Sequence, residues 1–274
     1  MLAVVQGLTE FLPISSTAHL VLVPWFFGWR DPGLTFDVAL HVGTLIAVLA
    51  YFSRTWTELT ISGLGLRRPP DSIDAIASHL SNKKLFWLLV LSTIPAGAAG
   101  WLLQKQVETT LRNPVVMGTA LILIALLMAW GEKVGTANKD ITRVGLADSL
   151  WIGFSQALAL IPGVSRSGIT MTAALIRNFQ RVDAARYSLL LSTPIIFGAS
   201  LKTALDAAQG GIQQEMIFPM VVGIIVAAVV GYLTISFFLK YLQFGTFKIF
   251  VYYRIILGIM VLALALFVRL EITP

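Results

Sequence analysis

Six long apolar stretches constrain the fold of this chain more than any other feature. They cover roughly residues 36–53, 84–104, 114–131, 184–208, 216–240 and 249–269. A helix needs about 20 apolar residues to cross the hydrocarbon core of a bilayer, so each stretch predicts a transmembrane helix. Hydrophobic residues make up 57% of the chain and charged residues only 12%, which excludes an ordinary soluble domain. We therefore predict an all-α integral membrane protein.

Two further apolar regions are interrupted by polar residues, and their separate pieces are too short to span a bilayer. The interruptions fall at Pro13-Ile14-Ser15-Ser16 and at Ile161 to Arg166. Proline and glycine stop a helix, and serine caps the start of the next one. The pattern predicts two re-entrant helical hairpins, over residues 1–29 and 146–179, in addition to the six spans.

The two hairpins divide the chain into similar halves. Each hairpin is followed by three predicted spans, so residues 1–140 and 141–274 form two repeats within one membrane domain. Because three is odd, the repeats have opposite orientation in the membrane, and their broken helices meet near its midplane. Non-helical backbone at that depth requires a surrounding of protein or a watery cavity. The hairpin tips are therefore expected to line a cavity.

The 20 lysine and arginine residues support this topology. With both hairpins re-entrant, most of them fall on one side, which the positive-inside rule makes cytoplasmic. The balance becomes nearly even if the second hairpin crosses the membrane, whereas it does not change if the first one does. This assignment puts the polar loop from Arg54 to Lys84 in the cytoplasm and both termini outside. The net charge of +6 is scattered over loops, so no nucleic-acid partner is expected.

The segment Pro162-Gly163-Val164-Ser165-Arg166-Ser167-x-x-Thr170 has the composition of an anion site. If Ser165 or Ser167 begins the returning half-helix, unpaired N–H groups and the positive end of the helix dipole point into the cavity. Arg166 adds a fork of donors for phosphate oxygens, and Ser165, Ser167 and Thr170 add hydroxyl groups. The structural alternative is that the serines only cap the helix while Arg166 pairs with a buried carboxylate.

The first hairpin carries the complementary chemistry. Gln6 and Glu10 are four positions apart on one helix face, and their oxygens suit a hard divalent cation such as Mg²⁺ or Ca²⁺. Glu10 is alternatively a general base, and His19 is a candidate acid, base or nucleophile. Ser15 and Ser16 are either attacking hydroxyls or simple helix caps, and the structural role for His19 is an interhelical hydrogen bond. His41, Thr44 and Gln156 are interpreted mainly as packing residues.

These motifs resemble those of the bacterial undecaprenyl-diphosphate phosphatases associated with bacitracin resistance. The resemblance rests on Gln6-x-x-x-Glu10, on Pro13-Ile14-Ser15-Ser16-Thr17-Ala18-His19 and on the segment from Pro162 to Thr170. It implies hydrolysis of a polyprenyl diphosphate to the monophosphate, with a divalent cation, to recycle the lipid carrier of cell-wall synthesis. It also implies a site that opens to the outer face of the bacterial cytoplasmic membrane.

By the positions of the motifs, the family's functional residues fall on the two hairpins of this chain. The resemblance assigns catalytic roles to Glu10, Ser16, His19 and Arg166, with Gln6 and Glu10 at the metal. Phosphate binding is assigned to Ser15, Ser165, Arg166, Ser167 and Thr170. Membrane lipids and a second copy of the chain are the other partners expected.

A transporter or flippase of polyprenyl phosphate is the rival interpretation. Inverted repeats with broken helices are a transporter plan, and a phosphate-binding cavity suits the transport of a lipid phosphate. The residue chemistry favours the enzyme, because transport alone does not require a carboxylate, a histidine and serines opposite an arginine. The sequence leaves open whether the attacking group is a serine, His19 or water.

Overall fold

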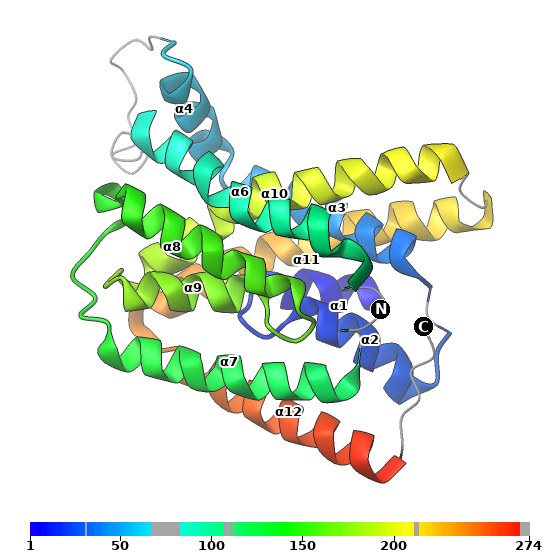
Figure 1. Ribbon diagram of the computed structural model, residues 1–274. Helices are drawn as coiled ribbons and strands as arrows, with labels where there is room; N and C mark the ends of the chain where they lie inside the picture. The colour runs from blue at the N-terminus through cyan, green and yellow to red at the C-terminus, as the bar shows by residue number, and fades with distance from the viewer. Residues whose placement is uncertain (31, 67–82, 107–110, 112, 211–213, 269–274) are drawn as a thin grey trace.

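The protein is an assembly of helices (Figure 1). The structure, a computed structural model, describes residues 1–30, 32–66, 83–106, 111, 113–210 and 214–268. The helices are α1 (Leu2–Thr9), α2 (Ser16–Phe27), α3 (Leu34–Tyr51), α4 (Ser53–Gly63), α6 (Lys83–Gln106), α7 (Pro114–Val134), η2 (Ile141–Arg143), α8 (Leu146–Ala157), η3 (Leu158–Leu160), α9 (Arg166–Ile176), α10 (Arg181–Gly210), α11 (Gln214–Phe244) and α12 (Lys248–Val268). No β-strand occurs within these described ranges.

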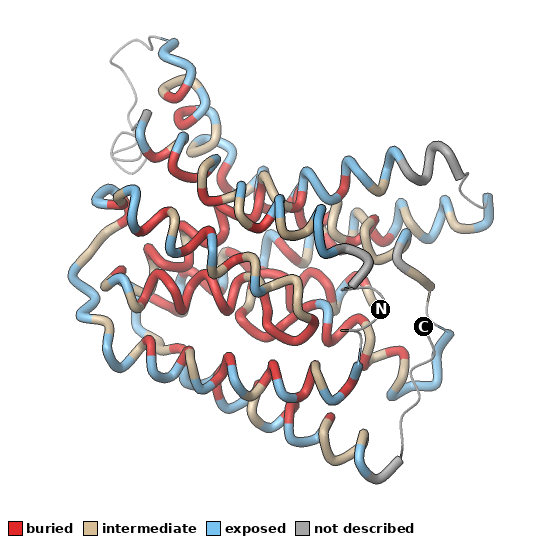
Figure 2. The backbone as a smooth tube through the Cα atoms, viewed as in Figure 1, coloured by how far each residue is buried: buried red, intermediate tan, exposed pale blue. Residues whose placement is uncertain are grey.

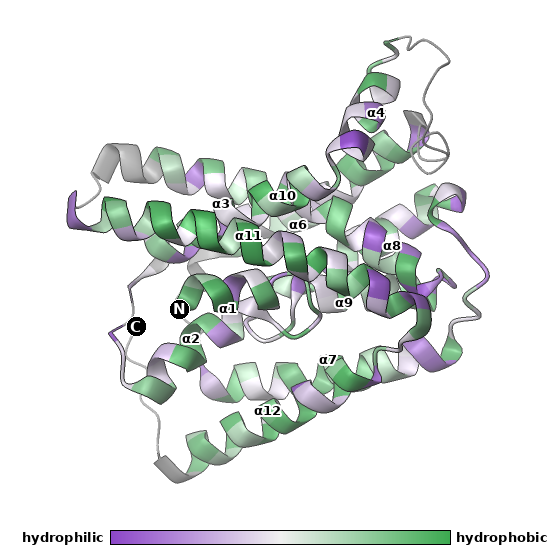
Figure 3. Ribbon diagram, turned by 180° about the vertical axis from the view of Figure 1, so that it is seen from behind, coloured by the Kyte–Doolittle hydropathy of each residue, from purple (hydrophilic) through white to green (hydrophobic). Residues whose placement is uncertain are grey.

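Five of these helices are long and apolar enough to cross a membrane, namely α6, α7, α10, α11 and α12. A sixth span results if α3 and α4, which meet at a 78° bend, are counted as one broken segment. Each of the five begins and ends within a few residues of a predicted apolar stretch. The outer faces of α11 and α12 are predominantly hydrophobic (Figure 3), which is what contact with lipid requires. The prediction of a helical membrane protein is confirmed at this level.

The predicted polar loop from Arg54 to Lys84 is wrong over its first part, because α4 occupies Ser53–Gly63. The apolar side of this helix faces the bundle, where Leu59 is fully buried. The indole Nε1 of Trp56 donates to Thr193 Oγ1 over 3.2 Å. This helix was mistaken for a loop because apolar residues occupy only one of its sides. Residues 67–82 of the predicted loop lie outside the described part of the chain.

The helix breaks lie where the sequence predicts them. Residues 10–15 separate α1 from α2, and residues 161–165 separate η3 from α9. Both returning helices begin after a serine with positive φ, 75° at Ser15 and 70° at Ser165. A positive φ is uncommon for residues other than glycine and costs about 1–3 kcal/mol, so the surrounding structure must enforce it. The two halves therefore share a backbone feature as well as a sequence pattern.

The two hairpins approach each other from opposite ends of the bundle, and their tips meet in its interior (Figure 1). The Ser167 hydroxyl donates to the carbonyl oxygen of Leu12 over 3.0 Å, which joins the second hairpin directly to the first. Figure 2 shows that buried residues concentrate on the hairpins, whereas the surrounding helices are exposed along their outer sides. The polar motifs of the two hairpins thus lie in a well-shielded part of the molecule.

Glycines set the close packing that holds each hairpin in place. A Cβ added at Gly153 of α8 would lie 2.7 Å from the Ser92 carbonyl oxygen of α6. A Cβ added at Gly7 of α1 would lie 2.9 Å from the Gly231 nitrogen of α11. Small residues let helix backbones approach closely in membranes, and here they do so on the first helix of each hairpin.

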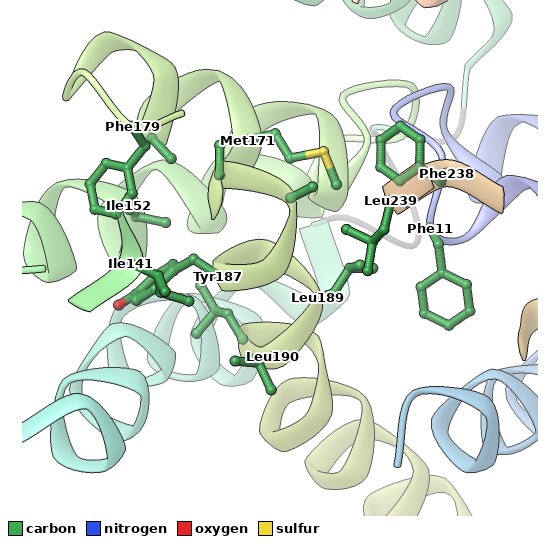
Figure 4. Close-up of a cluster of buried hydrophobic side chains, with 14 of the residues drawn as sticks. Phe11, Ile141, Ile152, Met171, Phe179, Tyr187, Leu189, Leu190, Phe238 and Leu239 are labelled. Atoms are coloured by element: carbon green, nitrogen blue, oxygen red, sulfur yellow. The ribbon is translucent and has the colours of Figure 1, made fainter. Parts of the chain in front are cut away.

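The largest apolar cluster supports the tips from the side of α9 and α10. Figure 4 shows Met171, Phe179, Tyr187 and Leu190 within it, together with Phe11 of the first hairpin. Close packing in a protein core holds side chains in defined rotamers. The cluster gives the polar tips a rigid support.

Candidate active site

Glu10 follows the last residue of α1, at the point where the first hairpin begins its turn. Its carboxylate is almost fully buried and accepts several hydrogen bonds. Oε2 accepts from the Ser16 hydroxyl at 2.6 Å and from the Gln6 side-chain amide at 3.2 Å. Glu10 therefore links both arms of the first hairpin, because Gln6 lies on α1 and Ser16 opens α2.

Arg166 is the first residue of α9 and pairs with Glu10 across the two hairpins. Its Nη2 donates to Glu10 Oε1 over 3.0 Å, and its Nη1 donates to the Ser188 carbonyl oxygen at the same distance. Its Nε is buried and has no hydrogen-bond partner among the described residues. A guanidinium with a free N–H beside the positive end of α9 is well suited to a phosphate group.

The hydroxyl groups near Arg166 have structural partners. Ser165 Oγ accepts from the Gly168 N–H at 3.1 Å, which makes Ser165 the N-cap of α9, and lies 3.2 Å from Ser167 Oγ. Thr170 Oγ1 lies 2.6 Å from Ser188 Oγ of α10. These three predicted phosphate-binding residues therefore surround the tip, and their hydroxyls shape it through hydrogen bonds to protein atoms.

His19 lies on α2, one turn beyond Ser16, and is held at both ring nitrogens. Nδ1 is 2.7 Å from the Ser15 carbonyl oxygen, and Nε2 is 2.6 Å from the Tyr253 hydroxyl of α12. The second contact is an interhelical hydrogen bond of the kind weighed as the structural alternative. No described hydrogen bond joins His19 to Glu10 or Arg166.

The structure thus gathers most predicted site residues at one junction. Gln6, Glu10, Ser16 and Arg166 form one hydrogen-bonded cluster, and Ser165, Ser167 and Thr170 enclose it from the second hairpin. Ser15 contributes its carbonyl oxygen to His19. The contacts weighed as structural alternatives are also present: Arg166 pairs with a buried carboxylate, Ser165 caps α9, and His19 makes an interhelical hydrogen bond.

His41 of α3 was interpreted as a packing residue, but it faces the cluster. Its Nε2 lies 3.5 Å from Glu10 Oε2, while its Nδ1 contacts the Asp37 carbonyl oxygen at 2.7 Å. A carbonyl oxygen only accepts hydrogen bonds, so Nδ1 carries a proton, and Nε2 is the ring nitrogen that points to the carboxylate. An ionisable residue inside a predicted span was the available sequence signal.

Arg254 lies within the predicted span 249–269, but at the sequence level it was counted only as one of the 20 basic residues that report topology. It is fully buried on α12 and donates only to backbone carbonyl groups in the described structure. Its Nη1 reaches Pro13 O at 3.1 Å, and its Nη2 reaches Gly163 O at 2.9 Å. One side chain therefore bridges the tips of both hairpins.

An apolar groove lies beside the second tip. It has a volume of about 380 Å³ and is bounded by α7, η3 and the turn before α9. Its walls include Val115, Thr119, Leu123, Leu158, Ile161 and Val164. Val164 immediately precedes the Ser165 cap, so the groove adjoins the polar junction.

Comparison with known proteins identifies the family. Residues 1–260 match the family described as bacitracin resistance protein BacA. The chain belongs to this family. An undecaprenyl-diphosphatase of Moorella thermoacetica is 48% identical over 96% of this chain and 95% of its own length. One from Pelotomaculum thermopropionicum is 47% identical over 97% of this chain and 95% of its own length. One from Trichlorobacter lovleyi is 43% identical over 96% of this chain and 95% of its own length.

The residues that match the BacA family include both hairpins. The match begins before Gln6 and extends beyond Arg254, so the cluster and the two unpredicted residues of α12, Tyr253 and Arg254, all lie within it. The family resemblance inferred from the two motifs is thereby confirmed.

Proposed function

We propose that this protein hydrolyses undecaprenyl diphosphate to undecaprenyl phosphate and inorganic phosphate, which recycles the lipid carrier of cell-wall synthesis. The observation that carries the proposal is the 3.0 Å contact between Glu10 and Arg166, two residues from opposite hairpins that meet in the bundle interior. Relatives that match this chain over nearly their full length are named undecaprenyl-diphosphatases. A lone structural ion pair would not need the serines and the capped helix N-terminus that surround it.

Arg166 is the main group that binds the terminal phosphate. Its unpartnered Nε–H and the N-terminus of α9 supply donors that stabilise the negative charge of the transferring phosphoryl group. In the reaction, an oxygen nucleophile attacks the terminal phosphorus and the anhydride P–O bond breaks. The lipid monophosphate leaves with the electron pair of that bond.

Glu10 is the proposed general base that activates the nucleophile. The Ser16 hydroxyl donates to it over 2.6 Å, so either Ser16 or a water in its position can lose a proton to the carboxylate. If Ser16 attacks, a water then hydrolyses the resulting phosphoserine, which releases inorganic phosphate and restores the hydroxyl group. His19 is screened from this cluster by its two hydrogen bonds, which makes it the less direct candidate nucleophile.

The same residues fit a divalent cation such as Mg²⁺ or Ca²⁺. Gln6 Oε1 is buried without a hydrogen-bond partner among the described residues, next to the Glu10 carboxylate. Two oxygen ligands are few for an all-protein cage, and the described residues contain no cluster of three ionisable ligands. Such cations complete their shell with water and phosphate oxygens, and when bound they neutralise phosphate charge.

The polyprenyl tail is assigned to the apolar groove beside Val164. The groove adjoins the Ser165 cap, so a diphosphate at Arg166 would direct its lipid chain along α7. A hydrocarbon chain in this groove contacts almost only apolar side chains.

The proposed topology has six spans and two re-entrant hairpins, in inverted repeats over residues 1–140 and 141–274. The opposed entry of the two hairpins and their matching positive-φ serines support it. In this arrangement the protein lies in the bacterial cytoplasmic membrane, with both termini and the site opening outside. A homodimer remains a prediction of the sequence.

The test is phosphate release from undecaprenyl diphosphate by the protein purified in detergent, with Mg²⁺ or Ca²⁺ present. We expect release by the wild type and a loss of about 100-fold or more in kcat for Glu10→Gln and Arg166→Lys. Removal of the cation with a chelator is expected to abolish release. Each variant conserves size, so the loss reports the carboxylate charge or the guanidinium fork.

Matched controls are Glu215→Gln and Arg143→Lys, which carry the same changes at exposed positions. Both are expected to retain wild-type activity. Binding of the diphosphate without phosphate release by the wild type, in a detergent system that has no second compartment, would contradict the proposal and support the transporter alternative.

A further inference from the structure

Tyr253 is outside both motifs, yet its hydroxyl makes a short contact with a site residue. It lies on α12 and its oxygen is 2.6 Å from His19 Nε2. The two rings are stacked, with centroids 5.7 Å apart and an interplanar angle of 10°. The contact joins residues that are 234 positions apart, so it depends on the packing of α12 against the first hairpin.

The direction of this hydrogen bond follows from the other side of the His19 ring. Nδ1 lies 2.7 Å from the Ser15 carbonyl oxygen, which can only accept, so Nδ1 carries a proton. In the neutral imidazole, Nε2 then holds the lone pair and accepts from the Tyr253 hydroxyl. The result is a directed chain in which Tyr253 donates to His19 and His19 donates to Ser15.

Tyr253 is the exposed end of this series of hydrogen bonds. Tyr253 is 42% exposed, whereas His19 is only 8% exposed. The next residue on α12 is Arg254, whose contacts with Pro13 and Gly163 fix this part of the helix against both hairpin tips. The turn of α12 that carries Arg254 therefore also fixes the position of the Tyr253 phenol relative to His19.

We propose that Tyr253 is a positioning residue for the phosphatase reaction, and that it acts by holding His19 in the Nδ1–H tautomer with its ring fixed behind Ser15 and Ser16. The ring orientation in turn fixes the Ser15 carbonyl and the start of α2, where the Ser16 hydroxyl meets Glu10. This inference rests on the proposed function only for its kinetic consequence. The hydrogen bond itself can be tested independently.

The independent test is NMR of the wild-type protein in detergent micelles with ¹⁵N-labelled histidine. The chain has three histidines, so substitution of His41 or His79 by glutamine identifies the His19 signals. We expect His19 to show a protonated Nδ1 and an unprotonated Nε2, with the Nε2 signal displaced by the strong hydrogen bond. In Tyr253→Phe, which keeps the stacked ring, that displacement is expected to disappear. A wild-type His19 protonated at Nε2 alone would overturn the proposal without any variant.

The kinetic test is a double-mutant cycle with His19→Ala. Tyr253→Phe is expected to lower kcat about tenfold with KM unchanged, and to have no further effect in the His19→Ala background, because coupled residues are not additive. Tyr252→Phe, an exposed neighbour, is the matched control and is expected to behave as the wild type. Equal losses in the two backgrounds would overturn the positioning role. An inactive wild type with the expected NMR signature would reject the proposed function and leave the hydrogen bond established.

Discussion

At the scale of single residues, Arg254 is the side chain on which the site geometry most depends. Its guanidinium donates to carbonyl oxygens of Pro13, Leu121, Gly163 and Val164 within 3.2 Å. A buried charge without a carboxylate partner is unusual and is maintained only when each donor finds an acceptor. The hydrogen bonds that the guanidinium would make to water are thus replaced by hydrogen bonds to three separate segments of the chain.

We predict that Arg254→Met lowers the free energy of unfolding by about 2–4 kcal/mol, because it leaves several buried carbonyl groups without donors. Arg254→Lys is expected to lose less, since an ammonium group retains some of these donors. Unfolding by SDS in mixed micelles measures both. Arg143→Met, at an exposed arginine, is the control. An Arg254→Met protein as stable as the wild type would contradict the bridging role.

The sequence was sufficient to predict that the polar residues of the two motifs lie close together, because clustered polar groups are rare in apolar segments. Glu10 and Arg166 were expected to face each other, and they do. Tyr253 and Arg254 were missed for a different reason. They belong to an otherwise ordinary apolar span, and only packing reveals that this face of α12 meets the hairpin tips. Arg254 within the span was a usable sign, but it was counted only as a basic residue that reports topology.

At the scale of helices, the contact between α6 and α8 shows how each hairpin is held. Gly153 lets α8 approach the backbone of Ser92, and the Ser92 hydroxyl lies 2.7 Å from both Ser149 Oγ and Tyr187 Oη. This buried hydroxyl cluster joins α6, α8 and α10. Hydrogen bonds of this kind contribute about 0.6 kcal/mol each in membrane proteins, so close packing of the two backbones stabilises the contact more than they do.

We predict that Gly153→Ala destabilises the protein by about 1–3 kcal/mol, because the new methyl group would overlap the Ser92 backbone. The matched control is Gly198→Ala on α10, where an added Cβ meets no atom within 4 Å. That change is expected to be neutral or slightly stabilising, since alanine favours helix more than glycine. Thermal unfolding in detergent distinguishes the two, and equal melting temperatures would contradict the packing argument.

At the scale of the whole molecule, the helix breaks and span order followed from apolar length and proline position, whereas the bend after α3 did not. The 78° turn at Phe52 redirects α4 out of the line of α3. A sequence window that contains both polar and apolar residues does not distinguish such an amphipathic helix from a loop. The angle depends on tertiary contacts, such as that of Trp56 with α10.

The absence of cysteine from the sequence makes the proposed topology directly testable. We predict that a cysteine at Arg30 reacts with a membrane-impermeant maleimide in intact spheroplasts, whereas one at Asn138 reacts only after permeabilisation. The two positions follow α2 and α7, which lead to opposite ends of the bundle, and both side chains are exposed. Labelling of both positions in intact spheroplasts would contradict the inverted arrangement.

The clasp made by Arg254 also has a consequence for biogenesis. A chain synthesised from its N-terminus carries both hairpin tips long before it carries α12. Until α12 inserts, no guanidinium of Arg254 ties the Pro13 turn to the Gly163 turn. A ribosome that stalls before Arg254 therefore leaves an unfinished polypeptide in which the two hairpins lack this shared guanidinium and are joined only by their direct contacts, such as that of Ser167 with Leu12.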